Sequence, residues 1–382
     1  MEVKRIFYLD HSTDFSGGQK SLLALLSRLN RSLFYPIVII DKKAATLESE
    51  LKKINVKFIK INYFNLKRLD KLLFPLLALR LFILIRKEKC SLLHCNTFKV
   101  GLICSVLSIV IKTPVIFRSR LGILVNSHGF VDKIIYQFSD LILANSFYVK
   151  RTFFERFGDD KKIEVVYNPL FLDYTLNEAI LKTLRAKYFS DSSLFYFGVI
   201  GRIEPFKRQH EIVEAVSHLS KQKQNFKIVF LGSPPVTGGA EYKNYLVKLI
   251  TEFKLEKFFD FAGFVMDINE ATSLLDCVIL CTEGEPLSRG IFESQFLKIP
   301  VIASNSGGNL ELIEDGKTGL LYELNNPHHL ATKMNQILES PKLKSQMVLN
   351  GYAFVSETFN PSKTVEQEER IYLKVLEKKR EA

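Results

Sequence analysis

Short apolar runs alternate with amphipathic stretches along almost the whole chain. The runs are rich in Ile, Val, Leu and Phe, and most are followed by a segment whose apolar residues recur at helical spacing. Strands that alternate with helices form βαβ units, so the pattern predicts mostly parallel sheets of the α/β class. In the first part of the chain the predicted strands are 5–9, 35–40, 56–61, 91–95, 115–119, 141–145 and 163–169.

Helical spacing in the first part of the chain predicts helices over 21–30, 66–89, 100–111 and 129–139. Pro75 interrupts the longest of these, so a kink is expected there. Residues 170–190 are polar with helical spacing and predict a bridging segment.

The alternation then begins again, which predicts a second α/β domain with its own sheet. The second set of predicted strands is 195–202, 227–232, 258–264, 277–282 and 300–304. Its predicted helices are 207–221, 240–254, 267–275, 288–297 and 308–313.

Two domains, 1–180 and 190–357, are therefore expected, followed by a terminal helix over 358–382. The pattern leaves open whether that helix packs back on the first domain. Ligands in open α/β sheets bind at the carboxyl ends of the strands. Two such domains facing each other are expected to form a ligand cleft between them.

Length and composition agree with this organisation. A chain of 382 residues, 47% hydrophobic and 25% charged, fits two folded domains and excludes a disordered or fibrous protein. No secretory signal is apparent, because the first ten residues already have a strand pattern. Five cysteines without a CxxC pair favour reduced thiols in the cytoplasm over disulfides or a zinc site.

The net charge of +12 is confined to the first half of the chain. Residues 1–180 hold 28 Lys and Arg against 16 Asp and Glu, whereas residues 181–382 hold 25 of each. A basic half indicates an acidic partner, and anionic lipid, a phosphorylated small molecule and nucleic acid are the candidates.

The segment GRIEPFKR, residues 201–208, follows the first predicted strand of the second domain. Arg202 and Lys207 could both reach one diphosphate, since Arg chelates phosphate oxygens and Lys acts as a point charge. A solvated basic turn is the plainer alternative.

The segment EGEPLSRGIFES, residues 283–294, follows strand 277–282 and opens a helix. Glu285 falls at the carboxyl end of the strand, and Glu293 about two turns into the helix. Carboxylates beside the backbone N–H groups of Leu287, Ser288 and Arg289 suit a polyhydroxyl ligand. A helix start that favours acidic residues is the plainer alternative.

Two glycine pairs, Gly17–Gly18 and Gly307–Gly308, each precede a predicted helix. Either pair could let a helix N-terminus approach a phosphate, and either could be an ordinary turn. His94, at the end of a strand, is expected to be a satisfied core residue. The chain has no P-loop, GxSxG or HxxxH motif, so nothing anchors a hydrolase, a nucleotide triphosphatase or a metal site.

Together these motifs resemble glycosyltransferase family 4, the retaining nucleotide-sugar transferases of GT-B fold. The second domain carries the resemblance best, through GRIEPFK, FAGFVMDINEATSLLDCVILCTEGEPLSRGIFES and PVIASNSGGNLELIEDGKTGLL. The first domain matches through its glycine pair, LILANS and VVYNP.

The resemblance implies roles for individual residues. Arg202 and Lys207 would hold the donor diphosphate, with Glu285 accepting hydrogen bonds from the sugar and Glu293 from the ribose. The remaining donor contacts would come from Gly17, Gly18, Val265, Leu287, Ser288 and Arg289. No metal or other cofactor is implied.

The chain departs from the family at several positions. Leu287 and Ser288 stand where Phe and Gly are common, and Ser294 stands in place of Ala. A family histidine in the first domain is missing after strand 115–119. Arg118 and Arg120 are therefore candidates for the acceptor side, where they could favour a phosphorylated or acidic acceptor, and His128 is a third candidate.

The resemblance implies a metal-independent, retaining hexosyltransferase that uses a nucleotide-sugar and a glycan or lipid-linked acceptor. Bacterial surface polysaccharide, such as lipopolysaccharide, capsule or exopolysaccharide, would be the product. The basic first domain favours a cytoplasmic protein at the face of an anionic membrane. The alternative is a non-catalytic protein of GT-B fold that binds a nucleotide, anionic lipid or nucleic acid, although no nucleic-acid signature is present.

Overall fold

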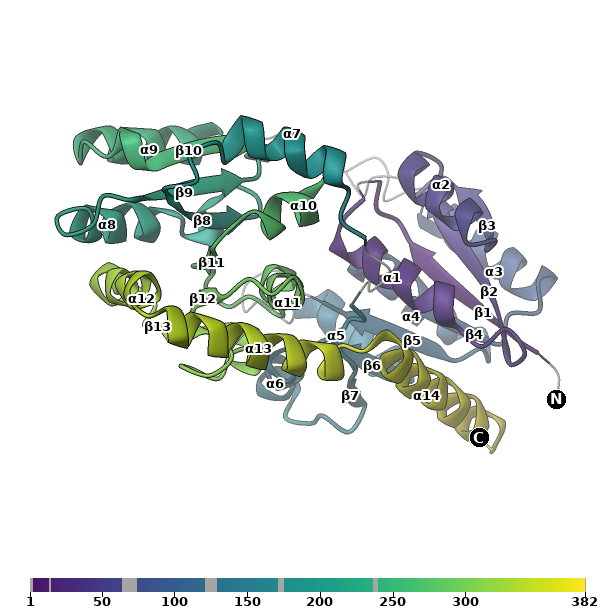
Figure 1. The fold of residues 1–382 in the computed structure, drawn as a ribbon. Coiled ribbons are helices and arrows are strands. Elements are labelled where there is room, and N and C mark those ends of the chain that lie inside the picture. The colour runs from purple at the N-terminus through teal and green to yellow at the C-terminus, as the bar shows by residue number, and fades with distance from the viewer. Residues whose placement is uncertain are drawn as a thin grey trace. The chain divides into compact units, whose positions relative to one another are not determined.

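The computed structural model contains two compact units, one of residues 1–172 with 359–382 and one of residues 173–358 (Figure 1). The structure describes residues 3–13, 15–63, 74–120, 129–170, 175–235 and 240–381. Each unit has its own parallel sheet with helices, which confirms the predicted fold class of two Rossmann-like α/β domains.

Unit 1, as we name the first of these, has a seven-stranded sheet in the order β3-β2-β1-β4-β5-β6-β7. Its strands are β1 (Lys4–Asp10), β2 (Phe34–Asp41), β3 (Lys57–Ile61), β4 (Leu92–Cys95), β5 (Val115–Ser119), β6 (Leu141–Ala144) and β7 (Ile163–Val165). Its helices are α1 (Gly17–Arg28), α2 (Ala45–Lys53), α3 (Phe74–Lys87), α4 (Phe98–Ser108), α5 (Gly129–Phe138), α6 (Phe147–Phe157) and α14 (Pro361–Glu381).

Alternate residues of each central strand of unit 1 enter two different cores. Phe7 and Leu9 of β1 join one apolar cluster, and Ile6 and Tyr8 join the other. Such a sheet is covered on both faces, so its strands read as continuous apolar runs in the sequence. The terminal helix α14 packs beside α1 and places Tyr372 in the second cluster, although it is far from these residues in sequence (Figure 1).

Unit 2, the second compact unit, has a six-stranded sheet in the order β10-β9-β8-β11-β12-β13. Its strands are β8 (Phe195–Ile200), β9 (Phe226–Leu231), β10 (Phe259–Gly263), β11 (Cys277–Leu280), β12 (Val301–Ser304) and β13 (Leu320–Tyr322). Its α-helices are α7 (Glu178–Tyr188), α8 (His210–Leu219), α9 (Ala240–Glu252), α10 (Ile268–Ser273), α11 (Arg289–Phe296), α12 (Pro327–Glu339) and α13 (Pro341–Thr358). Its described residues also include the short 3₁₀ segments η2 (Pro205–Lys207), η3 (Glu256–Phe258) and η4 (Gly307–Glu311).

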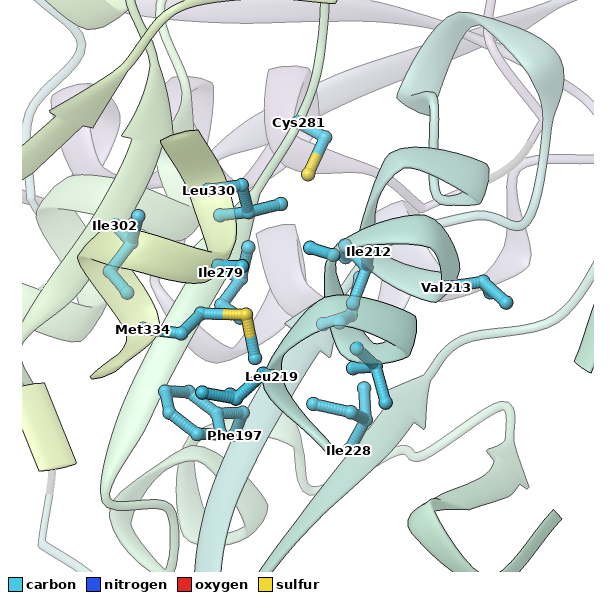
Figure 2. Packing of buried hydrophobic residues seen from close by; sticks show 14 of the residues in the cluster. Phe197, Ile212, Val213, Leu219, Ile228, Ile279, Cys281, Ile302, Leu330 and Met334 are labelled. Carbon is cyan, nitrogen blue, oxygen red and sulfur yellow. The ribbon is translucent and has the colours of Figure 1, made fainter. Parts of the chain in front are cut away.

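One apolar cluster fills unit 2 between its sheet and the helices α8, α9 and α12. Phe197 and Ile279 from adjacent strands meet Ile212 of α8 and Met334 of α12 there (Figure 2). The cluster fixes where β8 and β11 end, because both strands contribute buried residues to it. It therefore also fixes where the polar loops after these strands begin.

Several expected boundaries differ from the observed ones. The predicted helix 308–313 is the 3₁₀ segment η4, and the predicted strand 163–169 ends at Val165. The sequence pattern did not predict the helices α2, α6, α12 and α13 or the strand β13. The predicted helix 66–89 is seen as α3, with 64–73 outside the described residues, so the kink expected at Pro75 falls at the edge of what is described.

Candidate functional site

Each sheet has a point where the order of its strands reverses direction. In unit 2 this point lies between β8 and β11, which are neighbours in the sheet but not in sequence. In unit 1 it lies between β1 and β4. The loops that leave such strands turn to opposite sides and open a crevice at the carboxyl end of the sheet, where ligands bind in this class of fold.

The loops after β8 and β11 bring Lys207 and Glu285 into direct contact. The Lys207 Nζ atom lies 2.6 Å from Oε2 of Glu285. Their side chains are 19% and 18% exposed, so the pair is largely shielded but still reachable from solvent. The structure thus joins a cation and a carboxylate, 78 residues apart in sequence, at the crevice of unit 2.

Arg202 does not share this carboxylate. Its guanidinium pairs with Glu204 at 3.0 Å and remains 68% exposed. Its backbone oxygen accepts a 2.8 Å hydrogen bond from Nε2 of Gln209, which fixes the loop rather than the side chain. Arg202 therefore stands at the same strand end as Lys207 but with a side chain in solvent.

The start of α11 presents backbone more than side chains. Leu287 and Ser288 are both buried, so their side chains are not available to solvent. Glu293 pairs with Arg289 at 2.5 Å, one helical turn away. Val265 lies in the loop after the edge strand β10, two strands from β8, between the exposed Phe264 and Met266.

The pair Gly307–Gly308 allows two loops of unit 2 to touch through their backbones. The N–H group of Gly308 donates to the backbone oxygen of Glu285 at 2.7 Å. The N–H group of Gly284 donates to Oγ of Ser306 at 2.8 Å, from the same pair of loops. The glycines thus hold the Glu285 loop in place, which is the turn interpretation of this motif.

We expect Gly307→Ala to lower the free energy of unfolding more than an alanine substitution at a left-handed glycine that has free space around it. Gly307 has φ +61°, and a Cβ atom there would lie 2.5 Å from the oxygen of Glu285 and 2.7 Å from its nitrogen. Gly316 has φ +75° with nothing within 4 Å, so Gly316→Ala carries the same strain without the collision. Chemical unfolding should show a loss larger for Gly307→Ala by about 1–3 kcal/mol, and equal losses would contradict the packing role.

Polar residues at the carboxyl ends of β1 and β4 line a cavity of about 860 Å³ in unit 1. Gly18 and the neighbouring cap residue Ser16 lie on its wall, together with the predicted Arg118 and Arg120. Gly17 and Gly18 form the first turn of α1, as the sequence pattern predicts for a strand-to-helix turn. His128 lies outside the described residues.

Arg118 has a partner in the interior of unit 1. Its side chain is 3% exposed, and NH1 lies 2.8 Å from Oε2 of the equally buried Glu368 of α14. Its NH2 atom also donates to the backbone oxygen of Val166. The guanidinium is therefore fixed within unit 1, and of the two arginines only Arg120 extends beyond the end of β5.

Sequence reasoning missed several polar residues that the structure places at the two crevices. In unit 1 these are Asp10, His11, Asn96 and Lys99, all on the cavity wall. In unit 2, Arg208 binds Glu211, Glu283 and Asn325 from three different segments. Asp10–His11 and Asn96–Thr97 directly end or follow strands at a reversal point, and this signal could have identified them.

Burial affects the protonation of one group on the wall of the unit 1 cavity, the His11 imidazole. Burial of the imidazole, followed by the nearby Lys99 ammonium, lowers the pKa of His11. The neutral ring lies 2.7 Å from Oγ1 of Thr97 through its Nδ1 atom. His11 therefore adds a polar group, and no charge, to the wall near neutral pH.

All five cysteines are free thiols, and Cys277 and Cys281 lie deep in unit 2. Burial raises the pKa of both thiols, so they act as small apolar core residues. Across the residues that the structure describes, His, Cys, Asp and Glu form no cluster of three with metal-binding geometry. Among the helices within those described ranges, none combines the length and apolar character needed to cross a bilayer.

Two family models match the chain. The model of the glycosyl transferases group 1 matches residues 182–354, and the model of glycosyltransferase family 4 matches residues 15–174. The boundary between the two matches falls in the segment that leads from unit 1 into unit 2.

The chain is also similar to individual proteins. Spore coat protein SA of Bacillus subtilis (strain 168) is 29% identical over 155 residues, which make up 39% of this chain and 40% of that protein. The chain thus covers less than half the length of this relative. The capsular polysaccharide biosynthesis glycosyltransferase CapM of Staphylococcus aureus is 22% identical over 312 residues, 77% of this chain and 79% of that protein.

A solved structure shares the fold over nearly the whole chain. The crystal structure of Anabaena Alr3699/HepE in complex with UDP superposes with a TM-score of 0.82 at 22% identity. The superposition covers 96% of this chain and 99% of that one. At this identity the likeness establishes the architecture of the two α/β units.

Proposed function

The chain belongs to the family 4 glycosyltransferases of GT-B fold, and from that premise we propose that it is a retaining, metal-independent hexosyltransferase. It moves a sugar from a nucleotide-sugar to a glycan or lipid-linked acceptor in the synthesis of bacterial surface polysaccharide. The observation that carries the proposal is the Lys207–Glu285 contact at the strand reversal of unit 2. The name of CapM supports capsular polysaccharide as the product, and lipopolysaccharide and exopolysaccharide are the alternative products.

Unit 2 is proposed to bind the donor. Lys207 meets the diphosphate as a point charge, with Arg202 supplying a second cation from the same strand end. Glu285 accepts hydrogen bonds from sugar hydroxyls, Glu293 from the ribose, and the loop at Val265 contacts the base. The backbone N–H groups of Leu287, Ser288 and Arg289 donate to the sugar or phosphate, which fits the buried side chains of the first two residues.

The proposed reaction breaks the bond between the anomeric carbon and the diphosphate while the acceptor oxygen bonds to the same face of the sugar. Oxocarbenium character develops on the ring, and negative charge develops on the leaving phosphate oxygen. That oxygen takes the proton of the acceptor hydroxyl, so no protein nucleophile is needed. Lys207 is proposed to stabilise the leaving charge without a metal.

Unit 1 is proposed to serve the acceptor, with Gly17 and Gly18 near the diphosphate. Its basic character suits a cytoplasmic protein that contacts an anionic membrane peripherally. Helix α3 supports this role, because Leu76, Leu79 and Ile83 are each more than half exposed on one side of the helix. Arg80 and Arg86 are exposed on the same helix and supply the positive charge that an anionic surface attracts.

A thermal-shift screen against UDP, GDP, ADP, CMP and their sugar conjugates, with and without chelator, tests the donor assignment. A ligand that binds only the folded state raises the melting temperature by mass action. We expect a selective rise with UDP or its conjugates, in line with the UDP held by Alr3699/HepE, and no effect of chelator. Loss of the rise in chelator would contradict metal independence.

Vesicles with and without an acidic phospholipid complete the same screen. Sedimentation of the protein with acidic vesicles only is the expected result, and its absence would contradict the membrane role. The family matches support a transferase rather than the alternative of a non-catalytic binding protein. Binding of lipid or nucleic acid with no response to any nucleotide would reverse that preference.

A further inference from the structure

The cavity of unit 1 is built at the strand reversal between β1 and β4. Asp10 and His11 come from the end of β1, and Asn96 and Thr97 from the end of β4. Its volume of about 860 Å³ lies in the range of small-molecule sites. It is therefore large enough for a sugar with a substituent.

Positive side chains dominate the described wall of this cavity. Lys99, Arg118 and Arg120 line it together with one carboxylate, that of Asp10. Arg118 is matched by Glu368, which is buried beside it in unit 1. Lys99 and Arg120 supply the other two positive charges of the described wall.

The single carboxylate on the described wall serves the protein itself. Asp10 is 1% exposed, and its oxygens accept hydrogen bonds from the Ser12 N–H group, Nε2 of Gln19 and Nδ2 of Asn96. The last of these is 2.6 Å long. Asp10 thus orients its neighbours, and both of its oxygens already accept hydrogen bonds from the protein.

Arg120 is held in place by this arrangement. Its NH1 atom donates to Oδ1 of Asn96 at 2.6 Å and to the backbone oxygen of Asn96 at 3.1 Å. The Asn96 amide is fixed from its other side by Asp10. A guanidinium that is oriented in advance loses little freedom when it binds an anion, and its planar fork suits phosphate.

The rest of the described wall is apolar, which indicates the kind of group that is attached to the anion. Phe98, Leu102 and Val131 provide apolar surface in the same cavity. The face of a sugar ring or the first carbons of a lipid fit such a surface, whereas a small inorganic ion alone would leave it uncovered.

We infer that this cavity binds a phosphate group of the acceptor, with Arg120 and Lys99 as its ligands and the apolar wall against the group that the phosphate carries. The inference rests on the proposed function and specifies the chemistry of its acceptor. The phosphate can belong to a soluble sugar phosphate or to a lipid-linked phosphate, and both present the same anion to Arg120.

Calorimetry with inorganic phosphate, glucose 1-phosphate, glucuronate and glucose tests the inference. The full-length Lys207→Ala variant serves as the background, so that the ammonium group of Lys207 in unit 2 does not contribute. We expect glucose 1-phosphate to bind best, and Arg120→Gln to weaken its binding about tenfold or more, as for the loss of a charged hydrogen bond. Arg156→Gln is the matched control, because Arg156 is exposed on α6 of the same unit.

A second experiment, with vesicles, decides whether the phosphate is lipid-linked or belongs to a soluble sugar phosphate. Vesicles that contain a polyprenyl phosphate are compared with vesicles of the same charge made with phosphatidylserine. Stronger retention by the polyprenyl phosphate, lost in Arg120→Gln, assigns the lipid-linked form. Binding of glucose 1-phosphate without such a preference assigns the soluble form.

Two results would overturn the inference. One is binding of glucose or glucuronate as tight as that of glucose 1-phosphate, and the other is an unchanged affinity for glucose 1-phosphate in Arg120→Gln. The proposed function would survive either result if the wild type still responds to nucleotides, and it fails separately if no nucleotide binds. Should Arg120→Gln fold poorly, Lys99→Gln and Arg120→Lys supply the same comparison.

Discussion

Replacement of Lys207 by alanine is expected to lower the turnover number by about 10²–10³-fold while unit 2 stays folded. The ammonium group lies at the strand reversal of unit 2, where a leaving diphosphate would gain negative charge. Its loss removes a charge that matters most in the transition state, so the effect falls on turnover more than on donor affinity. Initial rates at saturating donor, with circular dichroism as a check of folding, measure it.

Lys223→Ala is the matched control for this variant. Lys223 is a surface lysine of the same unit that pairs with Glu339 at 2.8 Å. Exposed pairs of this kind contribute little to stability, so its removal should leave turnover and folding unchanged. Normal turnover in Lys207→Ala would remove Lys207 from the mechanism.

The partner of Lys207 separates binding from transfer in the same assay. Glu285→Ala removes the carboxylate that lies 2.6 Å from the ammonium, so Lys207 becomes more available to a diphosphate. The affinity for the nucleoside diphosphate should therefore stay equal or increase, while sugar transfer falls. An equal loss of both would count against the proposed contact between Glu285 and the sugar hydroxyls.

Replacement of Glu368 by alanine is expected to destabilise unit 1 by about 3–5 kcal/mol. Glu368 is 1% exposed and holds Arg118 at 2.8 Å, so its loss leaves a buried guanidinium without its carboxylate. It also accepts a 2.6 Å hydrogen bond from the hydroxyl of Tyr372. Urea unfolding followed by circular dichroism measures the loss as a lower midpoint of unit 1.

His94 belongs to the same network without adding a charge to it. Complete burial, followed by the charges of Arg118 and Arg120, holds the pKa of His94 well below its usual range. Its Nδ1 atom lies 3.4 Å from Oε1 of Glu368, but because the ring is neutral this contact is not an ion pair near neutral pH. Arg118 is the cation that balances Glu368, which is why removal of the carboxylate is costly.

Two comparisons isolate the buried charge. Glu366 lies on the same helix and is 3.8 Å from Arg370, and both side chains are exposed. Glu366→Ala should therefore change the free energy of unfolding by less than about 0.5 kcal/mol. Replacing Arg118 and Glu368 together by methionine should restore part of the stability that the single change removes, because no unpaired charge remains. Equal losses in Glu368→Ala and Glu366→Ala would show that the pair is not the source.

The strand pattern identified the candidate site of unit 2 but not its contacts. Apolar runs end at Ile200 and Leu280, and polar residues follow both, so strand-end reasoning reached Lys207 and Glu285. That the two touch depends on the order of the strands, which places β8 beside β11. Arg202 stands at the same strand end, yet its side chain pairs locally with Glu204, and no spacing rule distinguishes it from Lys207.

The sequence by itself determined the class of fold, the presence of a second sheet in the later part of the chain, and the family. The pattern of apolar residues is sufficient for this, because a parallel sheet is buried on both faces and its strands are therefore continuous apolar runs in the sequence. Tertiary structure alone decided the partners of Arg118 and Arg120, which lie two residues apart at the end of one strand. Arg118 meets Glu368 of α14 and Arg120 meets Asn96, because packing brings these distant segments to β5. A charge takes its role from the partner beside it, and local sequence does not encode that partner.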